Sequence, residues 1–326
     1  MNRSIRYLAW ILSPLLVGIP ILLLAGWLAG WRGGGRGGKQ AVVLYCAQDQ
    51  PFAEALLKTF TERTGIGVRP VYDSEAVKTV GLANRLAAEK GSPRADVFWG
   101  NEELRTRQLD ALGVFGTNQW NPGGLGWVAF GQRTRRLVVH SSLVAESELP
   151  RSLMELTNAR WRGRLSLALP HFGTTSTHFH ALRAAWGEAV WKDWCRALAA
   201  NQPFLEEGNS HVVRRVARGE AQVGWTDSDD IEVAMKEGAP LRMLDLEVDF
   251  LAIPNTVGLV RPAPPGSPAR VLVEFLISPE VRTQLVQMGG LESADLVRGR
   301  RLDPDWAVLL RDLEKASGQL EEIFRR

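Results

Sequence analysis

Cysteine is scarce in this chain of 326 residues, which contains only Cys46 and Cys195. No CxxC pair occurs, and the cysteines and histidines do not follow the spacing of a zinc site. The composition therefore excludes a disulfide-dense secreted scaffold and a zinc ribbon. Because the order of strands and helices places the two cysteines in different lobes, we expect two buried free thiols rather than a disulfide.

Common catalytic motifs are also missing. The sequence contains no GxSxG, no HExxH and no phosphate-binding GxxxxGK[ST]. His178 and His180 are close in sequence, but a spacing of two does not place them on one helical face. We therefore predict that the protein is not an enzyme, has no catalytic residue and needs no cofactor, while a bound metal ion stays an open alternative.

Acidic residues are absent from the first 39 positions, which contain five basic residues. Subtracting these five from the 39 Lys and Arg of the chain leaves 34 basic against 36 acidic residues, a balance near −2. A nucleic-acid-binding body usually carries a clustered basic face. The charge distribution therefore excludes nucleic acid as an expected partner.

Residues 7–31 contain no charged side chain, and Arg3 and Arg6 precede them. A helix of this length, at about 1.5 Å per residue, is long enough to cross a hydrocarbon core of roughly 30 Å. A cleaved secretory signal is the alternative, and both remain open. The "RGGGRGGK" that follows is a flexible tether, so residues 1–40 are predicted to be an anchor or signal peptide plus tether. In either case we expect the rest of the chain in the periplasm or on the outer face of the cytoplasmic membrane, with membrane contact through residues 7–31.

Apolar strand patterns alternate with amphipathic helix patterns along the rest of the chain. "AVVLYCA" (41–47) and "ADVFWG" (95–100) read as buried strands, and Phe52 to Phe60 recur at helical spacing. This alternation predicts an α/β fold with a parallel sheet covered on both faces. A glycine-rich segment leading into "RRLVVHSSLV" is the expected crossover between domains, and "LAIPNTVGLVRP" the expected returning strand.

Polar residues follow two strands of the predicted sheet, in "YDSE" and "WGNE". Ligands of open α/β sheets bind beyond the carboxyl ends of the strands, so both loops belong at one edge. Single residues there can also serve only as helix caps. The candidate ligand-binding residues of this first lobe are Tyr72, Ser74, Glu75, Lys78, Trp99, Asn101 and Glu102.

Three later segments provide the candidates for the opposite wall. "HFGTTSTH" places several hydroxyls at a helix start, where free backbone N–H groups favour an anion. "EGNS" begins another helix, and "WTDSDD" repeats the strand-end polar cluster without the spacing of a calcium loop. The candidates are Thr174, Thr175, Ser176, Asn209, Ser210, Asp227 and Asp229.

Four ordered blocks within residues 42–290 resemble bacterial ABC-transporter solute-binding proteins of the iron(III) type. They begin with "VYDSEAVKTVGL", "LMELTNARWRGRLSLALPHFGTTSTH", "GNSHVVRRVARGEAQVGWTDSDD" and "FLAIPNTVGLVRP". The resemblance implies a two-lobed periplasmic-binding-protein fold of type II with a ligand cleft between hinged lobes. It also implies an ABC permease in the inner membrane as partner. The expected first lobe comprises residues 41–135 with 256–326, and the second lobe residues 136–255.

The ligand is the least determined part of this interpretation. Ferric-binding relatives hold iron through tyrosine phenolates, whereas this chain has only Tyr7, Tyr45 and Tyr72. The hydroxyl and amide candidates suit a phosphate- or phosphonate-bearing organic anion, which we favour. The carboxylate candidates suit an amine or a metal, so iron(III) or another metal ion is the first alternative. A membrane-anchored sensor with the same fold is the second.

Overall fold

The computed structural model describes residues 41–73, 78–116, 120, 125–245, 250–292 and 301–325. The predicted membrane segment 7–31, the tether, Ser74, Glu75 and the side chain of Lys78 lie outside this description. Within the described residues, no helix combines the length and apolar character that a membrane crossing requires.

The strands form one sheet with the order β2-β1-β3-β9-β4-β7-β5-β6, and β8 also pairs with β4. The strands are β1 (Val42–Cys46), β2 (Val68–Val71), β3 (Val97–Gly100), β4 (Trp127–His140), β5 (Leu165–Ala168), β6 (Phe204–Glu206), β7 (Val223–Asp227), β8 (Leu241–Leu244) and β9 (Ala252–Leu259). The helices are α2 (Gln50–Thr64), α3 (Lys78–Ala88), α4 (Glu103–Ala111), α5 (Gly173–Trp186), α6 (Glu188–Ala200), α7 (Asn209–Ala217), α8 (Ser228–Lys236), α9 (Pro268–Leu276), α10 (Pro279–Met288) and α11 (Trp306–Phe324).

The predicted α/β class is confirmed, but the sheet is mixed rather than parallel. β1 pairs in parallel with β2 and β3, and β5 does so with β6 and β7. β9 instead runs antiparallel to β3 and β4, and β4 runs antiparallel to β7 and β8. The local pattern does not reveal this, because an apolar strand has the same sequence signature in either direction.

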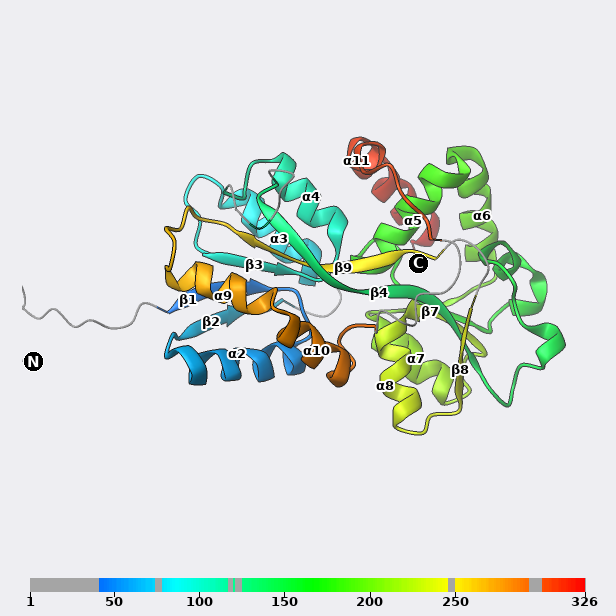
Figure 1. Cartoon of the computed structure of the whole chain (residues 1–326). Coiled ribbons are helices and arrows are strands. Elements are labelled where there is room, and N and C mark those ends of the chain that lie inside the picture. The colour runs from blue at the N-terminus through cyan, green and yellow to red at the C-terminus, as the bar shows by residue number, and fades with distance from the viewer. Residues whose placement is uncertain are drawn as a thin grey trace, which may run out of the picture. The chain divides into compact units, whose positions relative to one another are not determined.

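Two long strands, β4 and β9, lie side by side and join the two halves of the sheet (Figure 1). Residues 127–134 of β4 pair with β9, and residues 135–139 pair with β7 in the second half. The expected crossover after a glycine-rich linker is therefore one continuous strand, with a register shift beside Gly131. At this glycine φ is +59°, and a Cβ would lie 2.3 Å from Leu291 Cδ1, so a side chain would be strained there.

Local helix predictions agree well with the structure. α2 buries Ala53, Leu56, Leu57 and Phe60 on one face and ends at Gly65, which has a left-handed conformation. α3 ends at Ala88. Cys46 and Cys195 are both buried and form no disulfide with each other, as predicted.

The C-terminal helix α11 packs on the second half of the sheet rather than only on the first. Its Leu320 and Phe324 belong to the apolar cluster that contains Trp194 and Trp225. The ring of Phe324 makes an edge contact with Phe179 of α5 at 5.8 Å. The predicted lobe boundaries stay a prediction, but this packing opposes the assignment of residues 306–324 to the first lobe.

Candidate functional site

A cavity of about 310 Å³ lies among the starts of several helices from both halves of the sheet. Its wall comprises Asp49, Gln50, Pro51, Thr79, Asn101, Arg133, Ala168, Leu169, Phe172, Gly173, Thr174, Thr175, Glu207, Gly208, Asn209, Ser210, Asp227, Asp229 and Asp230. The volume falls at the lower end of the range of about 300–1,000 Å³ that is usual for small-molecule sites. We call this space the anion cavity.

Helix N-termini add partial positive charge to a wall that also contains five acidic residues. The first residues of α2, α5, α7 and α8 all line the cavity, and so does Thr79 in the first turn of α3. The opening N–H groups of a helix have no intrahelical partner, and the helix dipole adds partial positive charge there. Such helix starts, converging on one space, attract an anion.

The start of α5 supplies hydroxyls as well as backbone N–H groups. The hydroxyl of Thr174 already has a protein partner, because it donates to Asp227 Oδ2 at 2.9 Å. Thr175 is only 1% exposed, lines the cavity, and its hydroxyl has no hydrogen-bond partner among the residues that the structure describes. A buried hydroxyl without a partner costs free energy, so an acceptor from a ligand would stabilise it.

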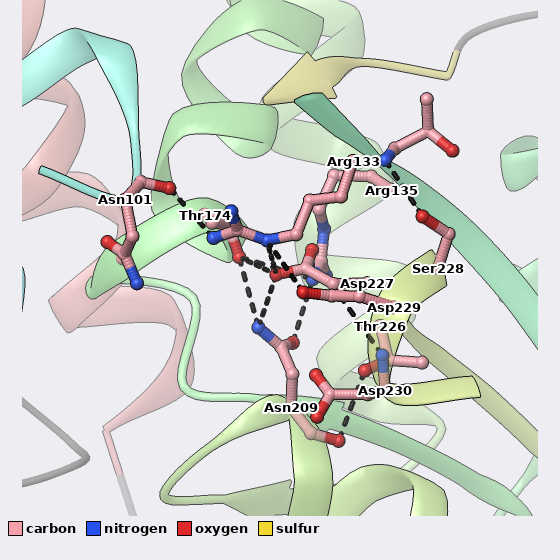
Figure 2. A network of polar contacts seen from close by, with 12 residues as sticks. Asn101, Arg133, Arg135, Thr174, Asn209, Thr226, Asp227, Ser228, Asp229 and Asp230 are labelled. Carbon is pink, nitrogen blue, oxygen red and sulfur yellow. Dashed lines mark hydrogen bonds and ion pairs between the residues drawn. The ribbon is translucent and has the colours of Figure 1, made fainter. Parts of the chain in front are cut away.

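Asp227 is the centre of a buried ion-pair network (Figure 2). Arg133 Nε donates to its Oδ2 at 3.1 Å, and Arg135 Nη1 donates to its Oδ1 at 2.8 Å. Asn209 Nδ2 donates to Oδ2 at 3.0 Å, and with Thr174 this makes four residues that donate to Asp227. Because Arg135 and Asp227 face each other across the β4–β7 pair, the strand register itself sets this contact.

Arg133 also joins the two halves of the sheet. Its Nη2 donates to the backbone carbonyl of Asn101 at 2.7 Å, beyond the end of β3, and its Nη1 donates to Asn255 Oδ1 at 3.2 Å. Its Nε lies 3.5 Å from Asp229. The guanidinium of Arg133 therefore contacts Asn101 in the first half of the sheet and Asp229 in the second. A movement of one half relative to the other would break one of these contacts.

Burial and charge move the pKa values of the three aspartates in opposite directions. Burial alone would raise the pKa of Asp227, but the Arg135 and Arg133 guanidiniums outweigh it and hold this pKa below its usual value. Burial raises the pKa of Asp229 to about 7, although Arg133 opposes the rise. Burial, together with the charges of Asp229 and Asp49, raises the pKa of Asp230 well above its usual value.

Asp229 makes stability depend on pH. Its folded-state pKa is raised, so the stability it contributes is complete below its ordinary pKa of 3.8 and is lost as the pH rises through about 7. Asparagine cannot ionise. We expect Asp229→Asn to raise the free energy of unfolding above that of wild type. Urea unfolding should show that this increase is about 1–2 kcal/mol larger at pH 8 than at pH 5. An equal difference at both pH values would contradict this assignment.

Comparison with known proteins identifies the family. The model of the bacterial extracellular solute-binding proteins matches residues 42–289. The chain belongs to this family. The family resemblance predicted from the sequence is thereby confirmed.

One relative of this solute-binding protein is a "Fe(3+)-binding periplasmic protein" of Serratia marcescens. The two are 27% identical over 197 residues, which cover 57% of this chain and 56% of the relative. The match thus spans little more than half of that protein's length.

Two solved structures confirm the two-lobed periplasmic-binding-protein fold. Iron-bound HitA from Pseudomonas aeruginosa superposes with a TM-score of 0.75 at 20% identity, covering 87% of this chain and 99% of HitA. AfuA from Actinobacillus pleuropneumoniae, with fructose-6-phosphate bound, superposes with a TM-score of 0.76 at 20% identity, covering 87% and 98% of the two chains. At this identity the likeness shows the fold and not the ligand.

Seven of the predicted ligand-binding residues of this solute-binding protein meet at the anion cavity. They are Asn101, Thr174, Thr175, Asn209, Ser210, Asp227 and Asp229. These residues follow strands or begin helices on both halves of the sheet, as the strand-end argument predicted. Their role in binding stays a prediction.

Four other candidates lie away from the cavity wall, namely Tyr72, Trp99, Glu102 and Ser176. Trp99 is fully buried against Phe130, with 6.1 Å between the rings, and Ser176 is buried inside α5. Tyr72 packs on the apolar cluster around β1. The structure uses Trp99 and Tyr72 as core residues, so neither reaches the cavity.

Glu102 differs most from its predicted place. Its carboxylate accepts from the N–H of Leu104 at 2.7 Å and of Arg105 at 2.9 Å, and Thr177 of α5 donates to it at 2.8 Å. The side chain caps α4 and does not line the cavity. The sequence offered both interpretations for this loop, and the structure favours the cap.

Arg133, which lines the cavity, and Arg135, which pairs with Asp227, were not among the residues predicted from the sequence. "QRTRRLVVH" looks like the start of an apolar strand in which the arginines could face solvent. The structure buries Arg133 and Arg135 at 4% and 1% exposure. Their spacing of two could have indicated a shared role, because it places the side chains of Arg133 and Arg135 on the same face of a strand.

Proposed function

We propose that this protein is the extracytoplasmic solute-binding component of an ABC importer and that it captures a small phosphate- or phosphonate-bearing organic anion. The observation that carries the proposal is the buried hydroxyl of Thr175, without a partner in the described chain, at the start of α5 on the cavity wall. The neighbouring starts of α7 and α2 add N–H groups on the same cavity. The relative AfuA, whose fold this chain shares, has been solved with fructose-6-phosphate bound.

Hinge closure is the proposed mechanism of capture. The cavity wall includes Asn101 and Thr79, which lie beside the first half of the sheet, and Thr175 and Ser210, which lie beside the second. A ligand that contacts both halves favours the closed state by its differential affinity for that state. β4 and β9, which run between the halves, would carry the bending. The closed, loaded protein would then deliver its ligand to a permease in the inner membrane.

Tyrosine-ligated iron(III) is disfavoured. No tyrosine follows residue 72, and the hydroxyl of Tyr45 donates to Glu89 at 2.9 Å. Asp227, Asp229 and Asp230 do place carboxylate oxygens within 4.8 Å of one another. Asp227, however, already pairs with two arginines, so its charge is largely neutralised without a metal ion.

A thermal-shift panel tests the ligand class. We expect fructose-6-phosphate or a small alkylphosphonate to raise the melting temperature of the purified full chain, because a ligand that binds only the folded state stabilises it. Ferric citrate should produce no larger shift than citrate alone. A shift with ferric citrate that Asp229→Asn abolishes and Thr175→Val leaves intact would instead establish metal binding.

We propose that residues 7–31 direct export of the chain to the periplasm or the outer face of the cytoplasmic membrane, either as a cleaved signal peptide or as an anchor. N-terminal sequencing of the exported protein distinguishes the two. A mature chain that starts after the apolar segment would remove the main support for an anchored sensor. We also propose binding without turnover, in keeping with relatives that are binding proteins.

A further inference from the structure

We propose that the ligand extends from the anion cavity into a second, apolar cavity, so that the natural ligand is an organic phosphate or phosphonate with a carbon body of several atoms. This inference rests on the proposed function and names its substrate class more closely. The second cavity has a volume of about 280 Å³. We call it the side cavity.

The two cavities adjoin. Asp49, Pro51, Ser210, Asp229 and Asp230 line both. These residues belong to the starts of α2, α7 and α8, so the anion cavity and the side cavity meet at the same helix ends that surround the anion position. A ligand bound at the helix starts therefore lies next to the side cavity, and the proposal requires its carbon body to pass between these shared residues.

The side cavity has a different chemistry. Beyond the shared residues, its wall includes the apolar side chains of Phe52 of α2, Val213 of α7, and Val233 and Ala234 of α8. Arg214 and Glu237 are the two charged residues that complete it. At its far side a Cβ on Gly289 would lie 2.5 Å from Val233 Cγ2, so the end of α10 approaches α8 closely. Aliphatic and aromatic side chains on such a wall favour a carbon chain over an ion, because apolar contact releases water.

Two of the three shared carboxylates, those of Asp229 and Asp230, do not strongly oppose an uncharged carbon chain. Burial raises the pKa of Asp229 to about 7 and that of Asp230 well above its usual value, so these groups carry less negative charge near neutral pH than exposed aspartates do. A bare inorganic anion would leave the side cavity to water. The geometry thus favours a ligand with an anionic end and an uncharged body.

A homologous series of probes tests the inference by isothermal titration calorimetry on the purified full chain in detergent. The probes are inorganic phosphate, methylphosphonate, n-propylphosphonate and n-pentylphosphonate. We expect the affinity to rise about fourfold for each methylene that enters the side cavity. Methylphosphonate that binds as tightly as pentylphosphonate would overturn the inference and leave the proposed function standing. Absence of binding by every probe would contradict both.

Ala234→Trp fills the side cavity and should abolish the gain from chain length while leaving the affinity for methylphosphonate unchanged. Met235→Trp is the matched control, because Met235 is the next residue of α8, is 41% exposed and does not line either cavity. Ala234→Leu adds less volume and keeps the test valid if the tryptophan variant does not fold. Equal chain-length dependence in wild type and the Ala234 variants would refute the placement of the carbon body.

Discussion

Replacing Asp227 with asparagine is expected to lower the free energy of unfolding by about 3–5 kcal/mol, the usual range when one partner of a buried ion pair is removed. Asp227 accepts from Arg133, Arg135, Thr174 and Asn209, and it is 2% exposed. The amide keeps the shape of the carboxylate but not its charge. Arg135, whose side chain is fully buried, would lose its only ion pair within the described residues.

Urea unfolding followed by tryptophan fluorescence measures this loss. Asp193→Asn is the control, since Asp193 pairs with Arg196 at 3.6 Å while 80% exposed, and exposed pairs contribute little. The double variant Asp227→Asn with Arg135→Met should recover part of the stability, because it removes one unpaired guanidinium. A loss at Asp227 no larger than the loss at Asp193 would show that the network contributes nothing to stability.

Thr175→Val is expected to weaken binding of an alkylphosphonate by about 10–100-fold. A hydrogen bond to a charged group contributes about 1.5–3 kcal/mol, and valine matches threonine in shape but lacks the hydroxyl. Stability without ligand should stay the same or rise slightly, because the Thr175 hydroxyl has no partner within the described chain to lose and its unpaired burial costs free energy. The variant therefore separates binding from folding.

Isothermal titration calorimetry provides the affinity, and thermal unfolding of the same sample provides the stability. Thr157→Val is the matched control, because the hydroxyl of Thr157 donates to the Met154 carbonyl at 2.8 Å and is not on the cavity wall. Unchanged affinity in Thr175→Val would place the anion elsewhere. A similar loss in both threonine variants would point to an indirect effect.

Local signals in the sequence were sufficient for the parts of the site that depend on one element. The hydroxyl-rich start of α5 and the polar ends of β3 and β7 could be recognised because caps and strand ends have their own residue preferences. Thr175, Asn101 and Asp227 all lie on the cavity wall for this reason. The amphipathic face of α2 was predictable on the same basis.

Features that depend on pairing between distant strands could not be predicted. Whether Arg135 faces water or Asp227 is decided by the antiparallel register of β4 and β7, which brings together residues 92 positions apart. The same holds for Glu102, because Thr177 of a distant helix donates to it only in the folded chain. Sequence reasoning also treated Asp227 as available for a cation, whereas two buried arginines already use its charge.

A crystal structure of the protein with a bound alkylphosphonate tests the central claim most directly. We predict phosphonate oxygens within hydrogen-bond distance of Thr175 Oγ1 and of the first N–H groups of α5, with the carbon chain directed toward Ala234. A phosphonate bound elsewhere would contradict the account. So would a metal ion coordinated by Asp229 and Asp230 in protein that shows no phosphonate at α5.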